Sequence, residues 1–282
     1  MTSPSGHIAA RSPWPLRIAW GYLAAYALWV GAMLAGVITR GVTNDLVFLP
    51  LYIAAGFACL HAARVTVASP RTGRGWRLVA AAWFTSGVAA TLMMPLWVWQ
   101  IDWLETVSVA LYQLYFPLML LGFWQLVELP SGRLARLRLS VEGLIVMVAT
   151  VILAWYWIFR FDEAARSLLP YLKIVLLMFP GELAVAVGAV AIVHRSAQTG
   201  AARSLSLLSV GALAAVVADF MYEYDDLIWS VWSGPGADLL LGLAAALVIS
   251  AGILTPREAD AEQCPVAVIG PALVPYLAIG VI

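Results

Sequence analysis

Residues 171–187 read YLKIVLLMFPGELAVAV, an apolar run that carries Lys173, Glu182 and the pair Pro180-Gly181. The apolar segment around it, 168–193, exceeds the roughly 20 residues that an α-helix needs to cross a hydrocarbon core of about 30 Å. An ionisable side chain at the centre of such a span costs at least about 2.5 kcal/mol on insertion scales. The sequence therefore predicts a membrane helix in which Lys173 and Glu182 face protein or water.

The composition of the whole chain agrees with a membrane protein. Of its 282 residues, 63% are hydrophobic and 11% are charged, which is more apolar surface than a soluble domain of this size can bury. The 13 Trp and 10 Tyr fit residues that favour the membrane–water interface. Because the formal net charge is zero and no basic stripe occurs, we expect no nucleic-acid partner. Cys59 and Cys264 make no disulfide or metal pattern, so we expect no metal and no cofactor.

Apolar runs of spanning length predict an all-α, polytopic transmembrane helix bundle with eight complete spans and a partial ninth. The eight spans are 15–39, 46–66, 76–99, 106–128, 139–160, 168–193, 204–224 and 236–255. These spans form a membrane domain, 15–255, between a cytoplasmic tail, 1–14, and a cytoplasmic linker, 256–264. The last run, 265–282, is either an incomplete ninth span of a longer protein or a short interfacial hairpin softened by Pro271 and Pro275.

The arginines set the expected orientation, because Lys and Arg in short loops stay on the cytoplasmic side. With the N-terminus inside, the outer segments hold only Arg40, Arg160 and Arg166, and they are enriched in acids. The cytoplasmic segments hold Arg11, Arg17, Arg64, Arg71, Arg74, Arg77, Arg133, Arg136, Arg138, Arg195, Arg203 and Arg257. The bias repeats loop after loop and predicts a multi-pass membrane protein with a cytoplasmic N-terminus and with the lipid bilayer as its partner.

Two charges of opposite sign predict a polar cleft near the outer face. Lys173 and Asp219 lie on consecutive antiparallel spans, each about 7–8 Å below the outer boundary at a rise of 1.5 Å per residue. They are placed to form an ion pair, although Lys173 alone can also extend its stem toward the headgroups. Other polar residues at comparable depth complete the candidate ligand cleft: Tyr222, Glu223, Tyr112, Gln113 and Tyr115.

A break in the sixth span predicts a hinge beneath this cleft. Pro180 removes a helix hydrogen bond, so we expect a kink at Pro180-Gly181. Glu182 then opens a new helix and accepts from its free N–H groups, or is buried as the neutral acid. On the cytoplasmic side, Glu142 is expected to pair with Arg138 or to extend toward water. No catalytic motif such as HExxH, GxSxG or a Walker loop occurs in the chain.

Five stretches, in order, carry a resemblance to a known class of membrane region. They are YFPLMLLGFWQL (115–126), LRLSVEGLIVMVATVILAWYWIF (137–159), FPGELAVAVGAV (179–190), LLSVGALAAVVADFMYEY (207–224) and ADLLLGLAAALVISAGIL (237–254). Together they resemble the N-terminal multi-spanning sensory regions of bacterial diguanylate cyclases, cyclic-di-GMP phosphodiesterases and related histidine kinases. In those regions a tyrosine usually stands where Phe116 does, and aspartates where Glu142 and Glu182 do.

The resemblance implies a membrane input module that couples an extracytoplasmic or in-membrane stimulus to a cytoplasmic output domain beyond residue 282. It also implies a homodimer, a small molecule or physical stimulus as the input, and any enzymatic activity in the output domain rather than in this chain. The residues leave a second function open. A transporter of a small molecule or ion would use the broken sixth span, with Glu182 near the midplane.

Overall fold

The structure is a computed structural model, and it describes residues 14–37, 43–66, 69–99, 102–126, 141, 181–192, 202–228 and 233–255. Every regular element in these residues is an α-helix, as predicted. Six of the helices are long: α1 (Trp14–Leu34), α2 (Thr43–Val65), α3 (Pro70–Trp99), α4 (Asp102–Leu126), α7 (Ala202–Ile228) and α8 (Ser233–Leu254). A shorter apolar helix runs from Gly181 to Ile192.

Four of these helices are long and apolar enough to cross a membrane, and they indicate a membrane protein. The windows are Phe48–Val65 in α2, Thr106–Leu126 in α4, Arg203–Tyr222 in α7 and Gly236–Leu254 in α8. The described residues thus support four spans and not the predicted eight with a partial ninth. α1 contains Arg17 and three tryptophans, and the first turns of α3 contain Arg71, Arg74 and Arg77, which lower their hydropathy. The predicted spans 139–160 and 265–282, and most of 168–193, lie outside the described residues.

Local signals in the sequence set the helix ends. α1 ends at Leu34 rather than continuing to the predicted residue 39, because Gly36 adopts a left-handed φ of 71°. The N–H groups of Gly36 and Val37 then donate to the carbonyls of Met33 and Ala32, at 3.0 and 2.9 Å, which is the Schellman arrangement. At its N-terminal end, α3 begins with Pro70, directly after Ser69, and a proline is well suited to the first position of a helix.

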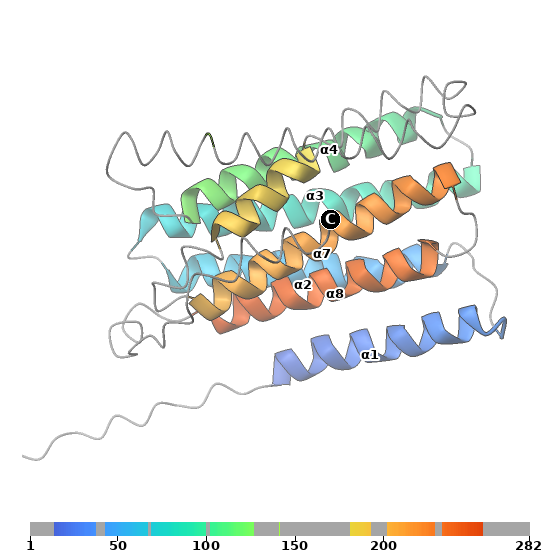
Figure 1. The fold of residues 1–282 in the computed structure, drawn as a ribbon, viewed down its shortest axis with the longest axis horizontal. Helices are drawn as coiled ribbons and strands as arrows, with labels where there is room; N and C mark the ends of the chain where they lie inside the picture. Colours follow the sequence, from blue (N-terminus) through green and yellow to red (C-terminus); the bar gives the residue numbers. More distant parts are fainter. Residues whose placement is uncertain are drawn as a thin grey trace, which may run out of the picture.

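The helices pack side by side as a bundle in which sequence neighbours are antiparallel (Figure 1). Short connections join α2 to α3 and α3 to α4, and these pairs, together with α7 and α8, make extensive contact. α8 also packs on α2, so that helices from the two ends of the sequence share one core. α1 lies at the edge of the bundle and packs on α8, where Trp20 Nε1 donates to Ser250 Oγ at 3.1 Å.

Small residues allow the closest helix contacts. α2 and α8 meet at Ala58 and Gly252, and Ala55 and Ala62, which share a face of α2 with Ala58, are fully buried. At Gly252 of α8, an added Cβ would lie 2.5 Å from the carbonyl carbon of Ala58 in α2, so only glycine fits. Small side chains let helix backbones approach in membranes, where helix association relies on packing rather than on the hydrophobic effect.

Candidate functional site

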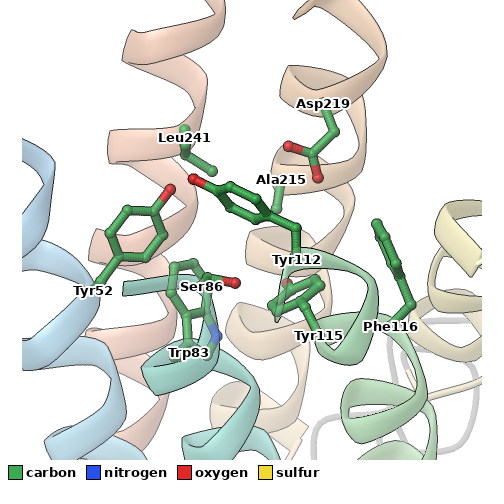
Figure 2. A pocket seen from close by; sticks show the side chains of 9 residues that line it. All are labelled: Tyr52, Trp83, Ser86, Tyr112, Tyr115, Phe116, Ala215, Asp219 and Leu241. Atoms are coloured by element: carbon green, nitrogen blue, oxygen red, sulfur yellow. The ribbon is translucent and has the colours of Figure 1, made fainter. Parts of the chain in front are cut away.

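Five helices converge on one polar and aromatic cavity, which we call the aromatic cavity. Its volume is about 40 Å³, enough for roughly three water molecules. Nine residues from α2, α3, α4, α7 and α8 line it: Tyr52, Trp83, Ser86, Tyr112, Tyr115, Phe116, Ala215, Asp219 and Leu241 (Figure 2). Cavities between the helices of a bundle are a common position for small-ligand sites.

The aromatic rings of the cavity wall pack against one another, with Tyr52 and Trp83 tilted at 42° and the other two pairs edge to face. The ring centroids of Tyr52 and Trp83 are 5.8 Å apart, and those of Trp83 and Tyr115 are 6.1 Å apart at an interplanar angle of 90°. Tyr115 and Phe116 continue the series at 5.5 Å. Such contacts are typical of stable aromatic pairs, so the wall is held in place by its own packing.

Asp219 supplies the carboxylate of the aromatic cavity. It lies on α7, within the candidate membrane span Arg203–Tyr222, and its side chain is half-buried. Figure 2 shows its carboxylate directed toward the space that Tyr112 reaches across, with the Tyr112 hydroxyl extended toward Tyr52. Within the described part of the chain, no lysine, arginine or histidine lines the cavity. The site therefore combines one acidic group, several hydroxyl groups and aromatic faces.

Two buried polar groups of the cavity wall have no hydrogen-bond partner among the described residues. They are the hydroxyl of Tyr115, a residue 6% exposed, and Nε1 of Trp83, a residue 1% exposed. Buried polar groups are normally hydrogen-bonded, and leaving one unsatisfied costs about 1–3 kcal/mol. Each of these two groups would gain a partner from a polar molecule that reached it.

A second polar contact joins α7 to α8 beside the cavity. The hydroxyl of Tyr222 donates to Oδ1 of Asp238, a carboxylate that is only 2% exposed. Tyr222 was predicted in the cleft, but it does not line the aromatic cavity. Its hydroxyl instead satisfies a buried acid on the neighbouring helix.

The remaining predicted cleft residues separate into several positions. Tyr112, Tyr115 and Asp219 all line the aromatic cavity. Gln113 is adjacent in α4 but does not line the cavity, and its buried Nε2 has no hydrogen-bond partner in the described residues. Glu223 lies within α7, and its side chain is outside the described set. The predicted ion pair of Lys173 with Asp219 stays a prediction, because Lys173 lies outside the described residues.

The predicted hinge is only partly within the described residues. The described part of the short apolar helix, Gly181–Ile192, follows the predicted break in the sequence, and Glu182 is 2% exposed within it. An added Cβ at Gly181 would lie 2.9 Å from Phe116, so this helix packs closely on α4 beside the aromatic cavity. Pro180, Glu142 and Arg138 lie outside the described residues, so the kink and the cytoplasmic pair remain predictions.

Sequence reasoning missed much of the cavity wall, namely Tyr52, Trp83, Ser86, Phe116, Ala215 and Leu241, as well as the buried Asp238. One signal was available: Tyr112, Tyr115 and Phe116 are spaced i, i+3 and i+4, so they share one face of a helix. The described residues contain no group of His, Cys, Asp and Glu side chains that could hold a metal ion. Comparisons of the chain with family models, curated proteins and solved structures find no match.

Proposed function

We propose that this chain is a membrane input module of a bacterial signalling protein. The observation that carries the proposal is the aromatic cavity, where Asp219 lies in a candidate membrane span at the junction of five helices. An ionisable residue at membrane depth is costly, and it usually marks a functional site. A molecule that occupies this junction contacts α2, α3, α4, α7 and α8 at once, so its binding can favour one packing of the bundle over another.

The finer features of the proposal rest on the sequence. We propose that the chain crosses the bacterial cytoplasmic membrane eight times with a partial ninth span, and that its N-terminus is cytoplasmic. The arginine distribution supports this orientation. It puts the aromatic cavity toward the outer half of the bundle, since Tyr52 and Leu241 lie in the halves of α2 and α8 nearer the outer loops. The resemblance supports a homodimer and an output domain beyond residue 282.

The test couples the cavity to an artificial output. The full chain is fused at its C-terminus to a diguanylate cyclase domain, and cyclic-di-GMP production is measured in membrane vesicles. Ala215→Leu fills the cavity, since Ala215 lines it and is 2% exposed. We expect a change of about fivefold or more in output, the lower end of typical coupling between sites.

Val217→Leu is the matched control, because Val217 lies on the same helix and is 49% exposed. It should leave the output unchanged. If both variants and the wild-type fusion produce cyclic-di-GMP at the same rate at equal protein levels, the cavity does not control an output and the proposal fails.

A transporter is the second candidate, and one observation favours it. The helix Gly181–Ile192 packs next to the aromatic cavity, where Gly181 approaches Phe116, and it carries a buried acid, Glu182. Discontinuous helices with polar residues near the midplane form the substrate sites of many transporters. Flux of small solutes into proteoliposomes that contain the purified chain, abolished by Asp219→Asn, would select this function over the input module.

A further inference from the structure

The described residues that line the aromatic cavity include one acid, Asp219, and no positively charged side chain. Asp219 brings a carboxylate to the candidate span of α7, and the described lining contributes no cation to balance it. A charge at membrane depth is normally paired with an opposite charge or with polar partners. The cavity therefore matches a ligand that carries a positive charge.

The rest of the wall accepts N–H groups and stabilises cations. Hydroxyl oxygens of Tyr112 and Ser86 line the space, and the Tyr115 hydroxyl is buried without a partner in the described chain. Each of these oxygens can accept a hydrogen bond from an ammonium group. Trp83 and Tyr52 also line the space. A cation over the face of such a ring gains cation–π attraction, worth about 0.5–1 kcal/mol at exposed sites and about 2 kcal/mol or more where water is excluded.

The size of the cavity limits what can enter. A volume of about 40 Å³ holds roughly three water molecules, which corresponds to a ligand of about three or four non-hydrogen atoms. A lipid headgroup or a peptide is too large. A hydrated metal ion is also a poor match, because aromatic carbons make up much of the wall and one carboxylate supplies the only charged oxygen ligands among the described residues.

We propose that the aromatic cavity binds a small primary alkylammonium ion, with Asp219 as its counter-charge, the hydroxyl of Tyr115 as an acceptor and Trp83 as a cation–π face. This assignment rests on the proposed function, for which it names the stimulus. The ammonium head group satisfies the carboxylate and the hydroxyl groups, while the short alkyl chain lies against Leu241 and Phe116. A neutral alcohol of the same size fits the space but brings no counter-charge to Asp219.

Isothermal titration calorimetry of the purified full chain in nanodiscs tests this directly. Ethylammonium chloride is compared with ethanol, its neutral counterpart of equal size, and with potassium chloride at equal ionic strength. We expect ethylammonium to bind at least tenfold more tightly than ethanol, and potassium to give no saturable heat. Equal binding of ethylammonium and ethanol, or binding of neither, would overturn the assignment.

Variants place the binding at the cavity. Asp219→Asn should weaken ethylammonium binding at least tenfold and leave ethanol unchanged. Tyr115→Phe, which removes one hydroxyl without changing the charge, should weaken ethylammonium binding severalfold. Asp238→Asn is the matched control, because Asp238 is a buried carboxylate of α8 outside the cavity lining, and its affinity should stay within about twofold. Ethylammonium binding that survives both Asp219→Asn and Tyr115→Phe would refute the site.

Lys173 offers the same chemistry from within the chain, since the sequence predicts its ammonium group opposite Asp219. If the wild-type chain fails to bind ethylammonium and Lys173→Met gains binding, the side chain of Lys173 is the occupant and the proposal is wrong. The outcomes also separate this site from the input function. If ethylammonium binds but does not change the output of the cyclase fusion, the ammonium site stands and the sensory role is refuted. If Ala215→Leu changes the output but ethylammonium does not bind, the input function stands and the ammonium site is refuted.

Discussion

Gly252→Ala is expected to destabilise the bundle by separating α2 from α8. The new Cβ would lie 2.5 Å from the carbonyl carbon and 3.0 Å from the Cβ of Ala58. Carbon atoms in ordinary contact are about 3.5–4.0 Å apart, so the two helices must move apart by about 1 Å. A gap of that size forfeits a quarter to a half of the dispersion energy of each contact it opens. Overpacking costs about 1–3 kcal/mol, and backbone contact favours the upper half of that range.

Thermal unfolding of the purified chain in detergent measures the effect. A loss of about 2–3 kcal/mol corresponds to a decrease in the melting temperature of roughly 4–12 °C, on the scaling for domains of 150–250 residues. Gly21→Ala is the control, because nothing lies within 4 Å of an added Cβ at Gly21 in α1. The same exchange there should not lower the melting temperature. Equal melting temperatures for the two variants would show that α2 and α8 do not approach as closely as the structure has them.

Three further predictions concern orientation and polar contacts. A membrane-impermeant thiol reagent added outside should label Asp226→Cys and spare Thr72→Cys, and the reverse pattern would overturn the proposed orientation. Tyr222→Phe should lower the free energy of unfolding by about 1–3 kcal/mol, because a buried carboxylate of α8 loses the hydrogen bond from α7; a change below about 0.5 kcal/mol would contradict that contact. Trp20→Phe removes the hydrogen bond to Ser250 and should cost about 0.5–1.5 kcal/mol in the same assay, with no loss if α1 is not docked on α8.

The helices could be predicted because a span needs only length and apolarity. Each of the six long helices coincides with a predicted span, and the errors fall at the ends. α3 begins at Pro70 rather than at the predicted residue 76, and its first turns carry the charged residues Arg71 and Arg74. Hydropathy marks the part of a helix that can lie in lipid, whereas capping residues such as Gly36 determine where it stops.

The cavity could be predicted only in part, because its polar residues are conspicuous in the sequence and its aromatic residues are not. Tyr112 and Asp219 stand out in sequence because polar groups are expensive in a span. Tyr52 and Trp83 do not, because a buried aromatic residue at helical spacing is most often part of a core. Asp238 lies near the start of its predicted span and resembles an interfacial acid, and only the packing of α8 against α7 buries it against Tyr222. The residue pattern within one helix does not show that side chains from five helices will meet at one cavity.

The two halves of the bundle differ in how closely their helices are packed. Toward the end of the bundle that holds Val65 and Leu254, small residues bring α2, α7 and α8 together: an added Cβ on Gly211 of α7 would lie 3.0 Å from the carbonyl oxygen of Ala244 in α8. Toward the other end the same helices contribute Tyr52, Asp219 and larger side chains around a cavity. Tightly packed backbones resist displacement, whereas a cavity can be filled or emptied at lower cost. An occupant would therefore move the helices mainly around the cavity, with the small-residue contacts as the fixed end. On this argument Ala215→Leu should change the output of the fusion protein with little loss of stability, whereas Gly252→Ala should lower stability by loosening that fixed end.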